Sequence, residues 1–185
     1  MARPHAALPR GPHRLARDEV LASQRGRMLD AIAGVVAERG YGATSVADVL
    51  ASAGVSRRTF YEHFRDKEAC FLAAYDAGVE ILMATMRDAG DDLRPRIRAF
   101  LATLAAEPAF ASTFVIEVVA AGPRALERRR AVHDAFAAMT GDAPEALACV
   151  GATNELIARE IAAGRTAELP ALEDLVVSIY ERLLR

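Results

Sequence analysis

The residues with the clearest chemical potential lie in one short segment, "GVSRRTFYEHFRDKEACF", residues 54–71. Two adjacent arginines, Arg57 and Arg58, stand near its start, and Tyr61 and His63 follow them. Arginine can donate two parallel hydrogen bonds to O6 and N7 of guanine, which discriminates between bases by about 1–3 kcal/mol. Hydroxyl, phenol and imidazole groups can bind phosphate oxygens. This combination of side chains predicts a surface that meets a nucleic acid.

Short helices joined by a tight turn must position these side chains. The sequence predicts a first helix at 19–39, a second at about 46–52, a third that Ser56 caps and that runs to about Phe64, and a fourth that Asp66 caps and that reaches about Ala89. Gly54 supplies the turn between the second and third helices, because other residues would be strained there. Ser45 and Asp48 form a capping-box pattern at the start of the second helix. The arrangement is that of a helix-turn-helix.

The third helix has two chemically different faces. Phe60 and Phe64 are four residues apart and share the face that we expect to anchor the helix in a core, while Val55 fills the turn. The opposite face includes the N-terminal end of the helix, and in a recognition helix this end points at base edges in the major groove. Lys67, the only lysine, lies on the first turn of the fourth helix, where free amides and its ammonium could hold a phosphate together. The predicted DNA-binding residues are Thr44, Ser45, Ser56, Arg57, Arg58, Thr59, Tyr61, His63 and Lys67.

Charge is unevenly distributed along the chain. Residues 1–67 hold 11 basic and 7 acidic side chains, a net charge of +4, whereas the remainder holds 12 and 18, a net charge of −6. A basic end on an acidic body is typical of a protein that meets a polyanion at that end. Residues 1–18 read as a disordered basic arm, which either lies along DNA or does nothing specific. Chance imbalance, or a helical hairpin with a solvated arginine pair, is the alternative to DNA binding.

The segment "TSVADVLASAGVSRRTFYEHFRDKEACFLAAYD" resembles the DNA-binding domain of the TetR family of transcriptional regulators. The residues that match the family pattern are Thr44, Ala53, Gly54, Val55, Ser56, Thr59, Phe60, Tyr61, His63, Phe64, Asp66, Lys67 and Glu68. Leu50 departs from it, since many members carry a small alanine there. The resemblance covers about residues 20–75. The resemblance implies a homodimer with about nine helices per subunit. It also implies that the dimer binds a palindromic operator, usually to repress transcription, and that a small molecule bound in the C-terminal domain releases the protein from DNA.

The remainder of the chain predicts further helices, so the fold class is all-α, with a helix-turn-helix domain at 19–67 and a helical effector-binding and dimerisation domain at 68–185. Prolines open these helices and glycines end them, which places five more helices after residue 92. One of them, 109–121, is apolar nearly all round, which is typical of a buried helix. Its single charge, Glu117, is either a polar anchor in an effector pocket or the partner of a nearby arginine.

An effector pocket and a dimer interface are expected in this second domain. Residues that could line the pocket, or else form plain core, are Met83, Met86, Phe100, Leu104, Phe110, Phe114, Glu117, Phe136 and Met139. His133 is expected to be structural or exposed. The apolar faces of the last two helices, with small residues that allow close approach, predict a four-helix bundle with a second subunit. The predicted interface residues are Leu147, Val150, Gly151, Asn154, Ile157, Ile161, Leu172, Leu175, Val176, Ile179 and Leu183.

Other function classes find little support. The sequence contains no nucleophile elbow, metal-ligand cluster or glycine-rich phosphate loop, so we expect neither an enzyme nor a metal or cofactor. Cys70 and Cys149 are expected to be buried, reduced thiols. No apolar run approaches the roughly 20 residues of a membrane span and no secretory signal is visible, so we expect a cytoplasmic protein without a membrane partner. A helix-turn-helix protein without an effector, controlled by a protein partner or by abundance, is the alternative function; a filled second domain would favour it.

Overall fold

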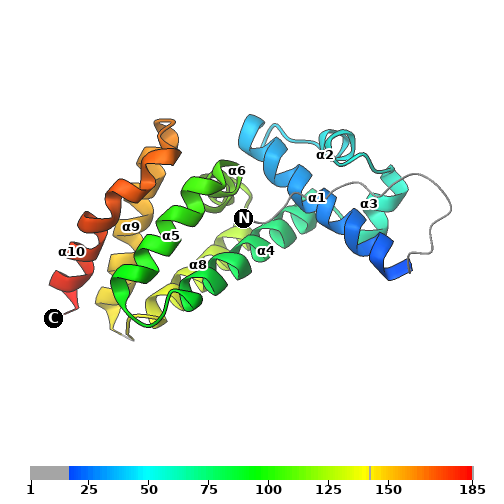
Figure 1. Cartoon of the computed structure of the whole chain (residues 1–185). Helices are drawn as coiled ribbons and strands as arrows, with labels where there is room; N and C mark the ends of the chain where they lie inside the picture. Colours follow the sequence, from blue (N-terminus) through cyan, green and yellow to red (C-terminus); the bar gives the residue numbers. More distant parts are fainter. Residues whose placement is uncertain (1–16, 142, 185) are drawn as a thin grey trace. The chain divides into compact units, whose positions relative to one another are not determined.

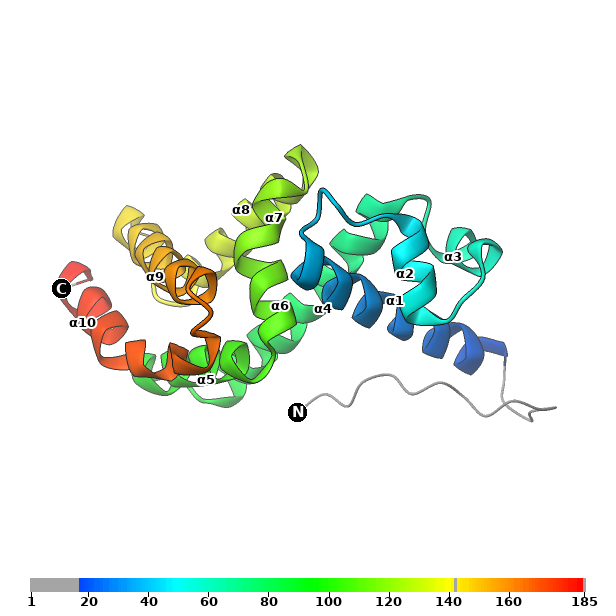
Figure 2. The same cartoon turned by 90° about the horizontal axis from the view of Figure 1, so that it is seen from above.

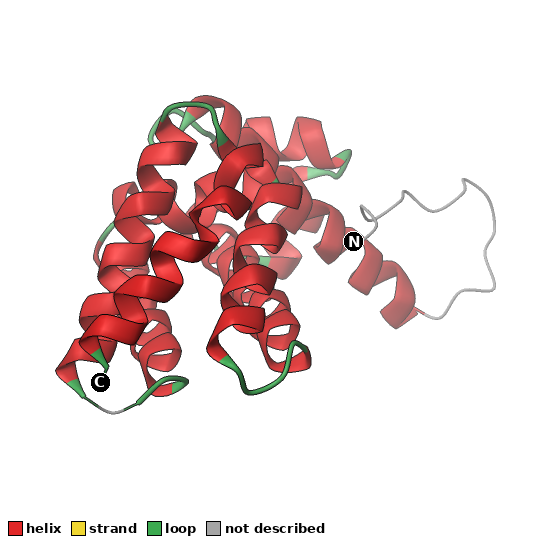
Figure 3. Ribbon diagram, turned by 60° about the vertical axis from the view of Figure 1, so that its left-hand side comes forward, coloured by secondary structure: helices red, strands yellow, loops and turns green. Residues whose placement is uncertain are grey.

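The computed structural model of the chain describes residues 17–141 and 143–184, and this part is helical and contains no strand (Figure 3). It divides into two compact units, residues 1–76 and 77–185, with the fourth helix contributing to both. The division therefore falls inside that helix, whereas the sequence placed it at residue 67. The predicted all-α fold class is confirmed. The predicted basic arm lies almost wholly outside the described residues.

The first unit contains three helices and the start of a fourth (Figure 1). They are α1 (Arg17–Arg39), α2 (Val46–Ala53), α3 (Arg57–His63) and α4 (Lys67–Asp88). The predicted capping box is formed: the Ser45 hydroxyl accepts from Asp48 N–H, and the Asp48 carboxylate accepts from Ser45 N–H at 2.9 Å. Gly40 and Gly54 have positive φ angles of 78° and 63°, which accounts for glycine at both helix ends.

The core of the first unit is built from the inward faces of these helices. Met28, Ile32 and Val36 recur at helical spacing on α1 and are fully buried. Phe60 of α3 and Phe71 of α4 are fully buried as well. Burying one such side chain contributes about 1.5–3 kcal/mol. The same core therefore holds the short helices α2 and α3, which would not be stable alone.

Among the described residues, the second unit packs the C-terminal half of α4 with six further α-helices. They are α5 (Leu93–Ala106), α6 (Pro108–Ser112), α7 (Val118–Ala120), α8 (Pro123–Ala138), α9 (Pro144–Ala162) and α10 (Glu173–Leu183). Figures 1 and 2 show α10 beside both α5 and α9, in agreement with the contacts between these helices. If α6 and α7 are counted as one interrupted helix, the described residues form nine α-helices, as expected.

Two segments differ from the regular helices that the sequence predicts. Thr113–Glu117 forms a turn of π-helix that joins α6 to α7, so the apolar helix at 108–120 is wider at its centre. Its burial is also incomplete, since Val119 is 53% exposed. Thr166–Leu172 forms a 3-10 helix with Pro170 inside it, and α10 begins only at Glu173. Proline lacks the N–H that a longer α-helix would need at this position.

An ion-pair cluster joins α5 to the start of α10. Arg98 donates to Glu173 through Nε at 2.9 Å and through a terminal nitrogen at 2.8 Å, and Arg94 donates to the same carboxylate at 3.0 Å. Hydrogen bonds from Arg98 and then Arg94 lower the pKa of Glu173 to about 2. The cluster gives the second unit a stabilising contact that depends on an ionised carboxylate.

The fourth helix is more apolar than the sequence analysis assumed. By length and composition α4 could span a membrane, contrary to the statement that no run approaches this limit. However, its apolar residues serve as core in both units, since Phe71, Tyr75, Leu82 and Met86 are buried. A core helix passes the same compositional test. The two cysteines are buried free thiols, as predicted.

Candidate nucleic-acid interface and effector cavity

The third helix separates its aromatic and basic side chains as the sequence predicts. Phe60 is fully buried and Phe64 is 5% exposed, and the Arg25 guanidinium lies 5.4 Å from the centre of the Phe64 ring. Arg57 and Arg58 are both exposed. The helix is therefore anchored through one face, and the adjacent arginines lie at the surface.

The turn before this helix is held by backbone and side-chain hydrogen bonds. Gly54 N–H donates to Leu50 O at 3.0 Å, and a terminal nitrogen of Arg27 donates to Ala53 O at 2.9 Å. Ser56 caps α3 by accepting from Thr59 N–H at 3.0 Å. These contacts fix the direction in which α3 leaves the turn, and hence the position of its exposed face.

Arg58 is available for a ligand at small cost. Its Nε donates to Glu62 at 2.9 Å, and its side chain is 90% exposed. An exposed pair at this spacing contributes about 0.3–0.5 kcal/mol. A bidentate contact with guanine, at about 1–3 kcal/mol, would outweigh it.

The remaining residues of the predicted DNA-binding set are placed less uniformly. Tyr61 is 48% exposed and stands edge-on against the Phe60 ring, so its hydroxyl is presented at the surface of α3. The hydroxyls of Ser56 and Thr59 bond to each other at 2.9 Å. His63 is half-buried, and its Nε2 is covered without a hydrogen-bond partner among the described residues.

Thr44 differs from the prediction that it reaches a phosphate. Its side chain is 3% exposed, and its hydroxyl donates to Gly40 O at 2.9 Å. The neighbouring Ser45 is exposed, but its hydroxyl is used in the capping box, where it donates to Asp48 at 2.6 Å. Both hydroxyls therefore shape the connection between α1 and α2.

Lys67 also differs from the prediction, because its ammonium already has partners in the protein. Nζ donates to Tyr41 O and to Thr44 O, both at 2.7 Å, and lies 4.0 Å from the centre of the Tyr41 ring. Burial lowers the pKa of this amine. Lys67 thus ties the start of α4 to the loop before α2, and the structure supports a structural role more directly than a phosphate contact.

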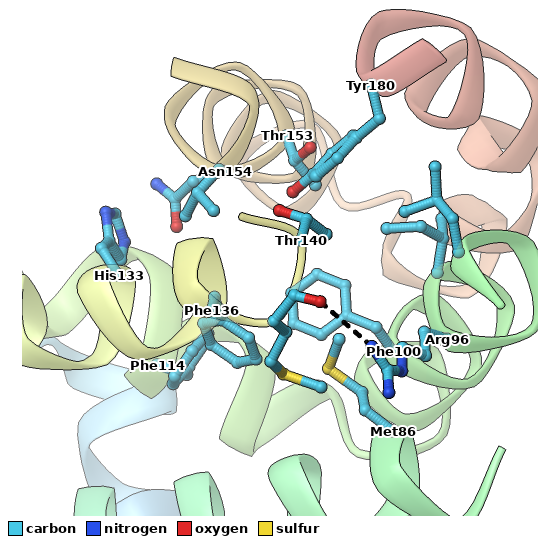
Figure 4. A pocket seen from close by; sticks show the side chains of 14 residues that line it. Met86, Arg96, Phe100, Phe114, His133, Phe136, Thr140, Thr153, Asn154 and Tyr180 are labelled. Atoms are coloured by element: carbon cyan, nitrogen blue, oxygen red, sulfur yellow. Dashed lines mark hydrogen bonds between the residues drawn. The ribbon is translucent and has the colours of Figure 1, made fainter. Parts of the chain in front are cut away.

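The second unit contains a cavity of about 40 Å³ (Figure 4). Five of the predicted pocket residues line it: Met86, Phe100, Phe114, Phe136 and Met139. Four others, Met83, Leu104, Phe110 and Glu117, do not. Phe110 instead covers Gly78 of α4, where a methyl group would overlap its ring. Leu104 is fully buried as plain core.

Glu117 was expected to be a buried carboxylate, either in the pocket or in an ion pair. It is half-buried and does not line the cavity. Phe114, from the same π-helical turn, lines the cavity as expected. The widened turn changes which residues share a face, so spacing along a regular helix does not place Glu117 relative to Phe114.

The cavity also has a polar side that the sequence did not predict. His133, Thr140, Thr153, Asn154 and Tyr180 line it, and they come from α8, the residues just after α8, α9 and α10. In Figure 4 the side chains of Thr153 and Tyr180 lie close together, as do those of His133 and Asn154. The available signal was a set of polar residues at helical spacing among apolar ones, but Asn154 was predicted to lie in a dimer interface.

The predicted dimer interface separates into inward and outward residues. Val150, Ile157 and Val176 are buried inside the unit, and Val150 and Asn154 line the cavity, so these four belong to the subunit's own interior. The half-buried positions are Ile161, Leu172 and Ile179. The exposed positions are Leu147, Gly151, Leu175 and Leu183. The inward and outward apolar faces of α9 are adjacent, so helical spacing alone could not tell the residues of one face from those of the other.

Among the described residues, no group of three or more His, Cys, Asp or Glu side chains could hold a metal ion.

Comparison with known proteins agrees with the helix-turn-helix geometry. Residues 28–74 match the family described as bacterial regulatory proteins, tetR family. The chain is also 37% identical over 100 residues to the HTH-type transcriptional activator FasR of Mycolicibacterium smegmatis. That match spans 52% of this chain and 43% of FasR, which is less than half of the relative's length.

Solved structures share the fold over nearly the whole chain. A TetR-like transcriptional regulator from Rhodococcus sp. RHA1 has a TM-score of 0.69 and 24% identity, with 92% of this chain and 98% of that chain covered. The transcriptional regulator FadR from Bacillus subtilis, solved in complex with stearoyl-CoA, has a TM-score of 0.59 and 17% identity, with 85% and 96% covered. At these identities the likeness concerns the fold.

Proposed function

We propose that this chain, which is a TetR-family transcriptional regulator, reads a palindromic operator as a homodimer through the exposed face of α3. The observation that supports this most strongly is the separation of side chains on α3. Phe60 and Phe64 are buried while Arg57 and Arg58 are exposed, at the end of the helix that follows the turn. An arginine pair so placed can contact base edges in the major groove.

A dimer is needed because α3 has only seven residues and can contact few base pairs. Two-fold symmetry presents two such helices about 34–36 Å apart, one turn of B-form DNA. Leu147 of α9 and Leu175 and Leu183 of α10 are each about half exposed in the single subunit. Apolar side chains on neighbouring helices are suited to a helical interface with a second copy.

We further propose that a small, largely apolar effector enters the cavity and releases the protein from DNA, so that the protein acts as a repressor. Support comes from the aromatic and methionine lining and from the fold shared with a FadR structure that contains stearoyl-CoA. Two observations favour other outputs. The cavity is far smaller than the 300–1,000 Å³ of typical ligand pockets, which favours a regulator without an effector. The relative FasR is an activator, which favours the opposite sign of regulation.

The test begins with an operator selected from random duplex DNA by the full chain. In gel-shift titrations, Arg57→Ala and Arg58→Ala should relax sequence preference at single operator positions, by about 1–3 kcal/mol. Arg87→Ala is the matched control, since Arg87 is an exposed arginine of the second unit. If both α3 variants keep the full preference for the operator over random DNA, α3 is not the reading helix.

Sedimentation tests the dimer separately. Leu175→Asp places a charge on the exposed apolar face of α10 and should convert the dimer to a folded monomer with reduced operator affinity. A wild-type chain that sediments as a monomer on operator DNA would contradict the dimer proposal. Transcription in vitro from the selected operator, with and without protein, then decides between repression and activation.

A further inference from the structure

The cavity in the second unit has two chemically different sides. Phe100, Phe114 and Phe136 supply an aromatic side, and Met86 lies with them in Figure 4. The opposite side carries hydroxyl, amide and imidazole groups. These polar groups would destabilise a plain hydrophobic core, because a buried polar group is costly unless it is hydrogen-bonded.

Thr153 is the clearest sign that the polar side is incomplete. Its side chain is 5% exposed and lines the cavity, and its Oγ1 interacts with the Tyr180 hydroxyl but has no hydrogen bond of good geometry among the described residues. Tyr180, on α10, brings its hydroxyl to the same place (Figure 4). When these two hydroxyls interact, the pair still retains one O–H donor and free lone pairs.

The polar groups of this side are uncharged near neutral pH. Burial raises the pKa of Tyr180 to about 12, so the phenol keeps its proton. Burial and then the charge of Arg129 lower the pKa of His133 to about 4, so the imidazole is neutral. These groups can bind a neutral hydroxyl or carbonyl, but they offer no counter-charge to an ion.

The charged residue of the lining, Arg96, is already committed. Its Nε donates to Gly90 O at 2.7 Å, and one terminal nitrogen donates to Met139 O at 3.1 Å. The other terminal nitrogen pairs with Asp91 at 2.6 Å, and the Arg96 side chain is only 14% exposed. These contacts use three of the five N–H donors of Arg96 and pair its charge with Asp91, so a carboxylate in the cavity would have to compete with Asp91, and an ammonium would find no anion in the lining.

From this geometry we propose that the cavity binds an uncharged amphipathic molecule, with an aromatic or compact apolar body and one hydroxyl or carbonyl oxygen at Thr153 and Tyr180. This inference rests on the proposed effector function and specifies the chemistry of the effector. The apolar body lies against the phenylalanines. Its oxygen completes the hydrogen bonding of Thr153.

The cavity must enlarge to admit such a molecule. Its present volume of about 40 Å³ holds only a few waters. Met86 and Met139 line it, and methionine has three rotatable bonds that let it repack around a ligand. Ligand entry thus requires side-chain rearrangement, in keeping with an effector that changes the state of the second unit.

Four probes with the same phenyl ring test the proposal by calorimetric titration into the full chain: propylbenzene, 2-phenylethanol, 3-phenylpropanoate and 2-phenylethylammonium. We expect the alcohol to bind about fivefold more tightly than propylbenzene, which corresponds to one net hydrogen bond of about 1 kcal/mol. Both ions should bind at least about tenfold more weakly than the alcohol, because the lining leaves their charge unpaired.

Variants assign the preference to the proposed oxygen site. Thr153→Val keeps the shape of the side chain, so it should abolish the advantage of the alcohol over propylbenzene and leave propylbenzene binding unchanged. Tyr180→Phe should reduce the same ratio and serves if the first variant is unstable. Thr103→Val is the matched control, since the Thr103 hydroxyl donates to Ala99 O at 2.8 Å within α5, outside the cavity lining.

Three results would overturn the inference: an ion that binds as tightly as the alcohol, an alcohol advantage that survives in both variants, or no binding of any probe. Operator gel shifts run in parallel separate this failure from a failure of the proposed function. If operator binding by the wild-type chain persists, only the effector chemistry is wrong. If operator binding is absent, the regulator proposal itself fails.

Discussion

Replacing Lys67 by methionine distinguishes a structural lysine from a phosphate ligand. Its ammonium donates to two carbonyls of the loop before α2, each at 2.7 Å, and lies over the Tyr41 ring. A hydrogen bond to a charged group contributes about 1.5–3 kcal/mol. Because these contacts are only part-buried, water recovers a share, and we expect Lys67→Met to lower the free energy of unfolding by about 2–4 kcal/mol.

Thermal unfolding and salt-dependent DNA binding measure the two roles independently. For a chain of this size the loss of stability corresponds to a fall in Tm of about 5–15 °C. Operator affinity should fall, but the slope of log K against log salt should stay the same, since no phosphate contact is removed. A lost phosphate contact would flatten that slope by about 0.9 each. Arg87→Met, on the same helix, is the control and should change neither quantity.

The opposite pair of results would refute this account. If Lys67→Met leaves Tm unchanged and flattens the salt slope, the ammonium leaves Tyr41 O and Thr44 O when DNA binds. Lys67 would then act as the phosphate ligand that its position at the start of α4 first indicated. Lys67→Arg gives a second measurement, since it keeps the charge but changes the geometry of donation to the two carbonyls.

Three further predictions concern pH and packing. His133 has a folded-state pKa of about 4, below its usual 6.5, so the unfolded chain takes up the proton first as the pH falls. Because solvent screens this half-buried group, wild-type stability should fall by about 1–2 kcal/mol between pH 6.5 and 4, and denaturation of His133→Gln should lack this decline. Glu173, with a pKa of about 2 against 4.5, stabilises above pH 4.5 and loses this effect as pH falls towards 2, so Glu173→Gln should show a flatter acid limb in the same measurement. Gly78→Ala should destabilise by about 1–2 kcal/mol, because overlap with the Phe110 ring outweighs the gain in helix propensity, whereas Gly34→Ala, which meets no atom within 4 Å, should be neutral or slightly stabilising in urea titrations.

Features determined by neighbouring residues could be predicted from the sequence. The capping box at Ser45, the left-handed Gly54 and the cap at Ser56 each depend on contacts within three or four residues. The prolines at the starts of α6, α8 and α9 act through their own backbone and were equally informative. The same applies to α3, where a four-residue spacing was enough to separate the buried Phe60 and Phe64 from the exposed arginines.

Features that depend on distant segments could not be predicted in this way. The partners of Lys67 are carbonyls 23 and 26 residues earlier in the chain, and carbonyls carry no sequence signal at all. Thr153 and Tyr180 come together only because α9 packs against α10. The sequence predicted that Val150, Gly151 and Asn154 share one face of the helix. However, consecutive residues are about 100° apart around a helix, so Gly151 lies on a different side from Val150. The polar side of the cavity depends on the same packing of α9 against α10, and buried hydroxyl groups in a cavity lining indicate the chemistry of a ligand more directly than an apolar lining does.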